Sequence, residues 1–275
     1  MKDFLHHLTT RLLPYFSAAE ARETAFWIIE ESTGLTRTQI LTGGKGTKNI
    51  PNIEIILQRI AKKEPIQYIF QHVLWNGLDL KVTPDTLIPR PETAELVQRI
   101  LSSRLPARPL KVLDVGTGSG CIAIALRQAM PEWQVTGLDI SAAAVAVAQE
   151  NAVRNHVDVH FVVGDIMGDD SFDGPYDILV SNPPYVRNSE AAEMTASVLD
   201  YEPHTALFVP DEDPLLFYRR IAERKMASEL WFEINEAFGP ATQDLLAQLG
   251  YTDVQLYRDS YGKDRFITAR RTQIV

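Results

Sequence analysis

The chain has 275 residues and a formal net charge of −9, from 36 acidic and 27 basic side chains. This length suffices for one large α/β domain together with a smaller one. The acidic balance argues against long nucleic acid as a direct substrate, because a protein that follows a phosphate backbone usually carries a basic face. No apolar run approaches the roughly 20 residues of a membrane-spanning helix, so no membrane partner is expected.

The cysteine and histidine content narrows the function further. Cys121 is the only cysteine, which excludes an internal disulfide and fits a reducing cytoplasm. The N-terminus lacks the apolar segment of a signal peptide, so we expect a cytoplasmic protein. The six histidines are scattered without metal-ligand spacing, and no metal site is expected. Cys121 follows a glycine at a predicted helix start, where we expect a buried packing residue.

The first 65 or so residues are predicted to form helices. Capping-box patterns start at Ser17 and at Thr36, each with Glu or Gln three residues later. Asn49 or Asn52 can cap a further helix that ends near Lys63 and has an apolar stripe on one side. We therefore expect a small helical domain, which either recognises a substrate or only stabilises the chain.

The next segment is predicted to be a β-hairpin that joins two domains. Asn76-Gly77 is the signature of a tight hairpin turn. The flanking strands are expected at residues 69–74 and 79–82. We therefore expect a helical domain over residues 1–66, a β-hairpin linker over residues 67–90 and a catalytic domain over residues 91–275. A helix is expected from about residue 93 to 104.

Beyond Pro109, predicted strands and helices alternate along the chain. Strands are expected at 110–115, 134–139, 158–163, 177–181 and 229–234. Helices are expected at 120–130, 142–154 and 238–249, and a final hairpin at 254–257 and 265–270. Such alternation indicates a mostly parallel sheet that is covered by helices on both faces. Ligands of such sheets bind at the C-terminal ends of the strands.

A glycine-rich turn follows the first of these strands. It consists of Gly116, Thr117, Gly118, Ser119 and Gly120. Glycine lets the backbone adopt positive φ and lets a ligand approach closely. The spacing is shorter than that of dinucleotide sites, which favours a nucleoside ligand with an amino-acid arm. Asp114, just before the turn, either meets the ammonium group of that arm or caps the amides of the turn.

Acidic residues also end the second and third predicted strands. Asp139 lies 19 residues after Gly120, where a carboxylate accepts hydrogen bonds from both ribose hydroxyls and would repel a 2′-phosphate. Asp165 is placed to face an adenine amino group, with the side chain of Ile166 over the ring. Asp165 alone would indicate a solvated loop. Its register with Asp114 and Asp139 favours the ligand.

A stiff corner, Asn182-Pro183-Pro184-Tyr185, ends the fourth strand. Each proline fixes its own φ and keeps the preceding residue out of the α region. The corner therefore presents an amide, free backbone carbonyls and an aromatic ring. It could merely end a strand. Alternatively, it grips a planar NH2 group by accepting both of its hydrogens while the ring packs on the plane.

Taken together, the glycine turn, Asp139 and the corner at Asn182 resemble class I S-adenosylmethionine-dependent methyltransferases that act on nitrogen. Further segments resemble the protein-(glutamine-N5) methyltransferases of bacterial peptide chain release factors. These segments are residues 65–69, 87–93, 201–203, 206–207 and 232–234. The sequence departs from the family pattern at Ala94, Asn235 and Ile166.

This resemblance implies a Rossmann-like class I fold with a seven-stranded sheet and a terminal antiparallel hairpin. It implies methyl transfer from S-adenosylmethionine to the glutamine of a Gly-Gly-Gln motif in release factors, which supports translation termination. Residues 116–120 would cradle the cofactor, with Asp139 on its ribose and Asp165 and Ile166 at its adenine. Asn182, Pro183, Pro184 and Tyr185 would hold the glutamine, and Asn182, Pro183 and Tyr185 are the expected catalytic residues.

Several alternatives remain open at this point. A methyltransferase for adenine N6 in DNA or guanine N2 in RNA could use the same corner. It would need a basic region, for which the chain offers only Lys45, Lys48, Lys62 and Lys63. A non-catalytic cofactor-binding module and a dehydrogenase are further alternatives. We expect a monomer that acts without a dedicated base, so that the amide proton passes to water.

Overall fold

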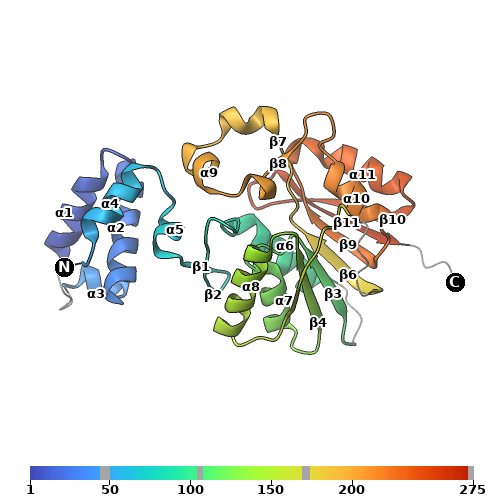
Figure 1. Ribbon diagram of the computed structural model, residues 1–275, viewed down its shortest axis with the longest axis horizontal. Coiled ribbons are helices and arrows are strands. Elements are labelled where there is room, and N and C mark those ends of the chain that lie inside the picture. The colour runs from blue at the N-terminus through green and yellow to red at the C-terminus, as the bar shows by residue number, and fades with distance from the viewer. Residues whose placement is uncertain (44–49, 104–107, 169–173, 272–275) are drawn as a thin grey trace. The chain divides into compact units, whose positions relative to one another are not determined.

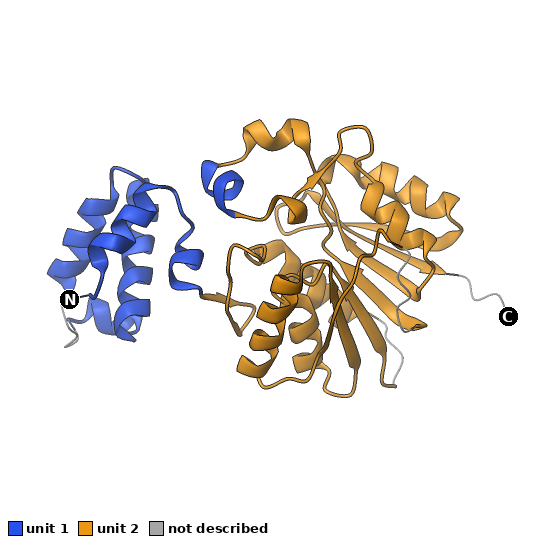
Figure 2. Cartoon of the chain, viewed as in Figure 1, with its two compact units in different colours: residues 1–71, 196–201 blue, residues 72–195, 202–275 orange. Residues whose placement is uncertain are grey.

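The computed structural model describes residues 1–43, 50–103, 108–168 and 174–271 (Figure 1). The chain forms two compact units (Figure 2). The helical unit comprises residues 1–71 and 196–201, and the sheet unit comprises residues 72–195 and 202–275. The domain boundaries that the sequence suggested, at residues 66 and 90, stay predictions.

Two of the helices of the first unit, α2 (Ala18–Thr33) and α3 (Arg37–Leu41), begin at capping boxes that the sequence shows. The others are α1 (Lys2–Leu12), α4 (Ile53–Ala61), α5 (Ile66–Phe70) and α9 (Ala196–Tyr201). Both capping boxes, at Ser17 and Thr36, are confirmed. Asn52 precedes α4, but its side chain makes no capping hydrogen bond. Asn49 lies outside the described residues, as do Lys45 and Lys48.

The predicted β-hairpin is confirmed but is shorter than expected. Strands β1 (Val73–Trp75) and β2 (Leu78–Leu80) pair in antiparallel fashion. The turn residues Asn76 and Gly77 have φ values of 48° and 80°, as a tight hairpin turn requires. The strand expected from residue 69 was wrong at its start, because residues 69 and 70 end helix α5.

Tertiary packing explains this error. The segment Ile66–Phe70 is rich in β-branched and aromatic residues, which favour strands. However, Ile66, Ile69 and Phe70 pack against the apolar core of the helical unit, and their spacing of three and four residues suits one face of a helix. The carbonyl of Pro65 accepts the first hydrogen bonds of α5.

The second unit is built on a seven-stranded sheet with the order β10-β11-β9-β6-β3-β4-β5. Its strands are β3 (Lys111–Val115), β4 (Gln134–Asp139), β5 (His160–Val163), β6 (Tyr176–Ser181), β9 (Ala227–Glu233), β10 (Tyr251–Arg258) and β11 (Asp264–Arg271). The five neighbouring strands β9, β6, β3, β4 and β5 are parallel to one another. Strand β11 pairs antiparallel with both β9 and β10. The predicted α/β fold, mostly parallel with a terminal antiparallel hairpin, is confirmed.

Helices cover both faces of this sheet (Figure 1). One layer contains α6 (Pro91–Ser102), α7 (Cys121–Ala129) and α8 (Ala142–Arg154), and the other contains α10 (Leu216–Glu223) and α11 (Gly239–Gln248). Helix α10 lies in a part of the chain for which the sequence suggested no element. The same part contains a short parallel pair of strands, β7 (Val186–Arg187) and β8 (Phe208–Val209). It also contains the 3-10 helices Asn188–Glu193 and His204–Ala206. A third 3-10 helix, Glu236–Phe238, follows β9.

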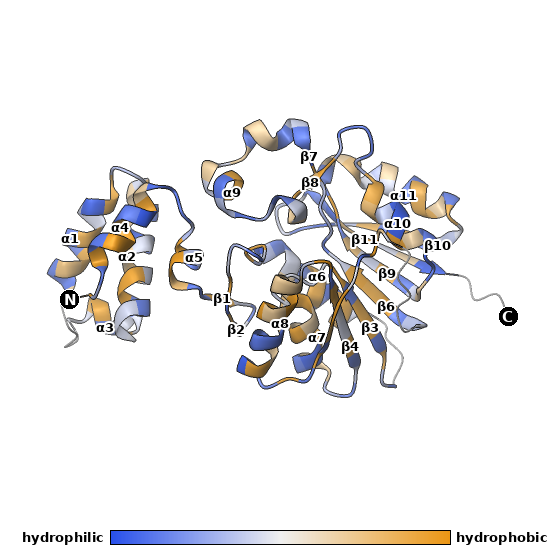
Figure 3. Cartoon of the chain, viewed as in Figure 1, coloured by the Kyte–Doolittle hydropathy of each residue, from blue (hydrophilic) through white to orange (hydrophobic). Residues whose placement is uncertain are grey.

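The core of the sheet unit lies between the sheet and these helices. The central strands are mostly hydrophobic (Figure 3). Leu113, Leu179 and Leu230, from three neighbouring strands, are at most 1% exposed. After β5 the chain crosses to the other side of β3 and enters β6. This reversal of winding direction creates the crevice in which ligands of such sheets bind. No helix among the described residues is long and apolar enough to cross a membrane.

Candidate active site

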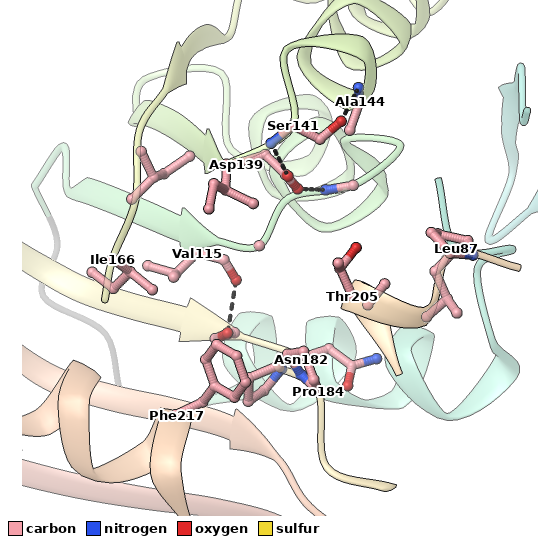
Figure 4. A pocket seen from close by; sticks show the side chains of 18 of the residues that line it. Leu87, Val115, Asp139, Ser141, Ala144, Ile166, Asn182, Pro184, Thr205 and Phe217 are labelled. Atoms are coloured by element: carbon pink, nitrogen blue, oxygen red, sulfur yellow. Dashed lines mark hydrogen bonds between the residues drawn. The ribbon is translucent and has the colours of Figure 1, made fainter. Parts of the chain in front are cut away.

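A cavity of about 480 Å³ lies at the C-terminal ends of β3, β4, β5 and β6 (Figure 4). Many of the residues singled out in the sequence line it. These are Gly116, Gly118, Asp139, Asp165, Ile166, Asn182, Pro183 and Pro184. The others lie next to these residues without lining the cavity. They are Asp114, Thr117, Ser119, Gly120 and Tyr185. Segments as far apart in sequence as Gly116 and Asn182 thus share one cavity.

The glycine turn has a backbone that only glycine adopts readily. Gly116, Gly118 and Gly120 have φ values of 71°, 53° and 80°, and an L-residue with a side chain is strained in this region. The N–H groups of Gly116 and Thr117 both donate to the Leu138 carbonyl oxygen, at 2.8 and 3.0 Å. These bonds attach the turn to the end of the neighbouring strand β4.

Asp139 ends β4 with its carboxylate at the cavity (Figure 4). Its Oδ2 accepts a hydrogen bond from the N–H of Gly118 at 2.9 Å, and its Oδ1 accepts one from the N–H of Ser141 at 2.9 Å. Burial raises the pKa of Asp139, while these two N–H groups oppose the rise. Each oxygen keeps a second lone pair, so the carboxylate can still accept two ligand hydroxyls.

Asp114 lies fully buried behind the glycine turn. Its Oδ2 accepts from the Thr117 hydroxyl at 2.6 Å and from the N–H of Ala123 at 3.2 Å. Its Oδ1 has no hydrogen-bond partner among the residues that the structure describes. Burial raises the pKa of Asp114 to about 7, against the opposing effect of these two donors. The carboxyl thus holds the turn and retains one oxygen for a further donor.

Asp165 and Ile166 follow β5 and both line the cavity. The Oδ1 of Asp165 accepts a hydrogen bond from the N–H of Met167 at 2.8 Å. The side chain of Ile166 is 8% exposed and belongs to the hydrophobic core of the sheet unit. Ile166 therefore presents a fixed apolar wall opposite Phe217, which also lines the cavity (Figure 4).

The Asn182 corner begins where β6 leaves the sheet. Ser181 pairs with Val115 in the register of β6 and β3. The Ser181 hydroxyl also donates to the Val115 carbonyl oxygen at 2.7 Å. The corner is thereby attached to the strand that carries the glycine turn. Pro183 is buried, and Asn182 and Pro184 are partly exposed to the cavity (Figure 4).

A buried group that the sequence analysis did not assign to the site lies behind this corner. The Asn182 side-chain nitrogen donates to the Thr93 hydroxyl oxygen at 3.2 Å. The Thr93 hydroxyl donates to Glu233 Oε2 at 2.7 Å, and the Tyr185 hydroxyl donates to Glu233 Oε1 at 3.1 Å. We call Asn182, Thr93, Glu233 and Tyr185 the Glu233 network. It joins α6, the end of β9 and the corner.

The electrostatics of this network are dominated by burial. Glu233 is 1% exposed, and burial raises its pKa to about 7 although Thr93 and Tyr185 donate to it. Burial and the neighbouring Glu233 carboxylate raise the pKa of Tyr185. Tyr185 packs against the hydrophobic core of the sheet unit and does not line the cavity.

Two segments that carried the family resemblance are joined near the same corner. Arg90 Nη2 lies 2.6 Å from Glu202 Oε1, and the N–H of Ile88 donates to Glu202 Oε2 at 3.3 Å. Glu202 is 4% exposed. This ion pair holds the residue before α6, and therefore the helix that carries Thr93.

The structure also adds lining residues that the sequence did not indicate. They include Pro84, Asp85, Thr86, Ser141, Ala144, Met167, Thr205, Phe217 and Ile221. Ser141 caps α8 by accepting from the N–H of Ala144 at 3.2 Å, and its position just after Asp139 was the available signal. Phe217 lies on α10, which the sequence did not predict, so nothing pointed to it.

The remaining predictions concern metals and Cys121. In the described parts of the chain, no group of three or more His, Cys, Asp or Glu side chains is arranged to hold a metal ion. Cys121 is buried at the start of α7, and burial raises the pKa of its thiol to about 12. The expectation of a buried packing residue is confirmed.

Comparison with known proteins gives consistent results. The family model "Methyltransferase small domain" matches residues 94–204. A release factor glutamine methyltransferase of Bacteroides thetaiotaomicron is 48% identical over 225 residues, which cover 80% of each chain. That of Flavobacterium psychrophilum is 41% identical over 278 residues, which cover 97% of this chain and 98% of the relative.

Solved structures support the fold. A methyltransferase from Pyrococcus furiosus has a TM-score of 0.53 and 17% sequence identity, covering 78% of this chain and 96% of that chain. At this identity the likeness shows the fold alone. The predicted Rossmann-like methyltransferase fold is confirmed.

Proposed function

Because the chain belongs to the family of release factor glutamine methyltransferases, we propose that it methylates the side-chain amide nitrogen of a release factor glutamine. The methyl donor is S-adenosylmethionine, and the glutamine is that of the Gly-Gly-Gln motif. The reaction supports translation termination. One observation carries the proposal: the glycine turn and Asp139 share a single cavity with the Asn182 corner.

The residues present fit this cofactor. The cavity volume lies within the range of small-molecule sites, roughly 300–1,000 Å³. Asp139 offers lone pairs for both ribose hydroxyls, and the orphaned, buried Oδ1 of Asp114 can accept from an ammonium group or from a water bound to it. Ile166 and Phe217 supply apolar walls for adenine, with Asp165 placed to accept from its amino group. The glycine turn, residues 116–120, would hold the cofactor from the side of β3.

The corner residues orient the substrate amide. An amide nitrogen is a poor nucleophile because its lone pair is delocalised into the carbonyl. S-adenosylmethionine, when bound, supplies a methyl group on an electrophilic sulfonium. The Asn182 Oδ1 and the Pro183 carbonyl oxygen accept the two amide hydrogens, and so aim the nitrogen and stabilise the positive charge that grows on it. Pro184, which lines the cavity, limits the position of the amide plane, and Tyr185 supports the corner from behind through its hydrogen bond to Glu233.

The proton of the methylated amide leaves without a dedicated base. Neither Glu233, which accepts from Thr93 and Tyr185, nor Glu202, which pairs with Arg90, lines the cavity. The amide hydrogens instead face acceptors that do not take up a proton, so the proton passes to water after transfer.

We further propose that residues 1–66 recognise the release factor and that the chain acts as a monomer in the cytoplasm. The single cysteine fits that compartment. Sedimentation of the purified protein checks the oligomeric state. A stable dimer at micromolar concentration would contradict the proposal of a monomer.

Methyl transfer from labelled S-adenosylmethionine to purified release factor tests the reaction. We expect label on wild-type release factor and none on a matched factor whose motif glutamine is replaced by alanine. Double-stranded DNA and ribosomal RNA serve as alternative acceptors. Label on nucleic acid alone would contradict the proposed substrate.

A further inference from the structure

The Asn182 side chain has two ends of similar shape and opposite hydrogen-bonding character. Only the oxygen end can accept a hydrogen from a substrate NH2 group, and the NH2 end would oppose it. The proposed reaction therefore requires that Asn182 point its oxygen toward the substrate. The shape of the amide does not distinguish its oxygen from its nitrogen, so a neighbouring group must fix which of the two faces the substrate.

The number of hydrogens available in the Glu233 network determines the orientation of the Asn182 amide. The Thr93 hydroxyl has a single hydrogen, and it lies 2.7 Å from Glu233 Oε2. An ionised carboxylate only accepts, so Thr93 must donate to Glu233. The Thr93 oxygen can then only accept from Asn182, which turns the Asn182 nitrogen toward Thr93, as the 3.2 Å contact shows.

We propose that Glu233 is a positioning residue that fixes the orientation of the Asn182 amide through Thr93. This inference rests on the proposed methyl transfer and deepens it. Glu233 touches no substrate atom. Its role is to keep the Asn182 oxygen facing the site by determining the direction of every hydrogen bond behind it.

Tyr185 determines how the network responds to a change at Glu233. Its hydroxyl donates to Oε1 at 3.1 Å, so Oε1 must remain an acceptor. Among the described residues the Tyr185 hydroxyl donates to no group other than Glu233, so its hydrogen keeps an acceptor in Glu233→Gln only if the glutamine oxygen faces Tyr185 and the NH2 group faces Thr93. Thr93 must then donate to Asn182, whose oxygen turns inward. Glu233→Gln should thus invert Asn182 while preserving every hydrogen bond.

Protonation of Glu233 has the same effect. With Tyr185 donating to Oε1, the proton of the neutral acid lies on Oε2 and faces Thr93. Other groups also act on Glu233. Arg265 on β11 favours the carboxylate, Glu92 on α6 opposes it, and the Tyr218 hydroxyl on α10 donates to the Glu233 backbone carbonyl at 3.1 Å. Since burial raises the pKa of Glu233 to about 7, the ionised network is lost as pH falls through that value.

The test compares Glu233→Gln in two backgrounds. In the otherwise wild-type enzyme we expect kcat for release factor methylation to fall about 100-fold, a typical effect of losing one polar transition-state contact. The KM for release factor and the Kd for S-adenosylmethionine should change less than about threefold. In the background of Tyr185→Phe, the glutamine is free to turn its oxygen to Thr93, and the same substitution should cost less than about 10-fold.

Matched variants separate positioning from folding. Glu223→Gln removes the same charge at an exposed site on α10 and should leave kcat within about twofold. Thr93→Ser keeps the hydroxyl and should retain most of the activity that Thr93→Val loses. Equal losses from Glu233→Gln in both backgrounds would overturn the proposal. So would a decrease in kcat below pH 7 that persists in Glu233→Gln.

A measurement without release factor keeps this proposal separate from the proposed function. The Asn182 side-chain amide resonance is identified by its disappearance in Asn182→Asp. We expect it to shift in Glu233→Gln and to return toward its original position in the double variant with Tyr185→Phe. An unchanged resonance would contradict the role of Glu233. Wild-type protein that binds S-adenosylmethionine but leaves release factor unmodified would contradict only the proposed function.

Discussion

The cofactor side and the substrate side of the site are each backed by a buried carboxyl. Asp114 lies behind the glycine turn and Glu233 behind the Asn182 corner, and each is at most 1% exposed. Each accepts a hydrogen bond from a threonine hydroxyl, at 2.6 Å from Thr117 and at 2.7 Å from Thr93. Burial raises the pKa of both carboxyls to about 7.

The difference between them lies in what they connect. Asp114 holds residues within nine positions of itself, in a turn that its glycines already constrain. Glu233 accepts from residues 140 and 48 positions away in the chain, so it joins separate elements. We infer that the first carboxyl supports local backbone geometry and thus cofactor affinity. The second supports side-chain orientation and thus the rate of transfer.

The largest effect should come from Asn182→Ala on the substrate side. Without Asn182 the substrate amide loses an acceptor, and we expect kcat to fall by about 1,000-fold or more. The affinity for S-adenosylmethionine, measured by calorimetry, should change little. Asn188→Ala, an exposed asparagine on the 3-10 helix that follows β7, is the matched control and should transfer normally. Substantial transfer by Asn182→Ala would refute the role of the corner.

Asp139→Ala probes the cofactor side and should show the opposite kinetic pattern. Loss of the acceptor for two hydroxyls should raise the Kd for S-adenosylmethionine by about 100-fold or more, since each charge-assisted hydrogen bond contributes roughly 1.5–3 kcal/mol. At saturating cofactor, kcat should fall much less. Asp158→Ala removes the same charge at an exposed position before β5 and should bind cofactor normally. An unaltered Kd for Asp139→Ala would exclude a ribose contact.

Asp114→Asn should change the pH dependence of stability. The pKa of Asp114 is raised to about 7 in the folded protein, so the folded state binds more protons than the unfolded chain between about pH 4 and 7. This group therefore makes the free energy of unfolding decrease as pH rises through that window. In Asp114→Asn the decrease should be shallower, by roughly 1–4 kcal/mol.

Urea unfolding at pH 5 and pH 8 measures this difference. The variant should gain relative to the wild-type protein at the higher pH. Parallel pH dependences in the two proteins would show that Asp114 stays ionised in the fold.

The smallest effect is expected at Cys121, which adjoins the glycine turn but serves only packing. Its thiol is buried and its pKa is raised to about 12, so iodoacetamide at pH 8 should not modify the native protein. Cys121→Ala should change methyl transfer less than about twofold and cost on the order of 1 kcal/mol of stability. Rapid alkylation of the native thiol would contradict its burial.

The sequence predicted the parts of the fold that local signals determine. Helix α8 and strand β4 have the predicted boundaries, because the capping Ser141 and the apolar periodicity agree there. Helix α10 was missed because it is short and follows no cap; its N-cap residue, Leu215, makes no side-chain hydrogen bond. Residues 69 and 70 were assigned to a strand but belong to α5, because long-range packing against the helical core decides between two conformations that the local sequence allows.

In the candidate site, too, the residues marked by local signals were predicted and those placed by long-range packing were not. The glycine turn, Asp139 and the Asn182 corner were visible because each follows a strand in the sequence. In the sequence, Glu233 stands out only as part of segment 232–234, which resembles the family pattern. Its burial beside Thr93, 140 positions away, depends on how α6 packs against β9. A carboxylate in a strand is normally expected at the surface, so no local signal marked it.

The pairing of β3 with β6 has a consequence for the reaction itself. The strand that ends in the glycine turn and the strand that ends in the Asn182 corner are direct neighbours, and Ser181 bonds to Val115 at their ends. Neighbouring strands are spaced about 4.8 Å apart. The spacing of these two strands thus sets the distance between the site of the methyl donor and the site of its acceptor. Because hydrogen bonds between the two strands fix this spacing, it does not depend on the conformation of the loops around the cavity.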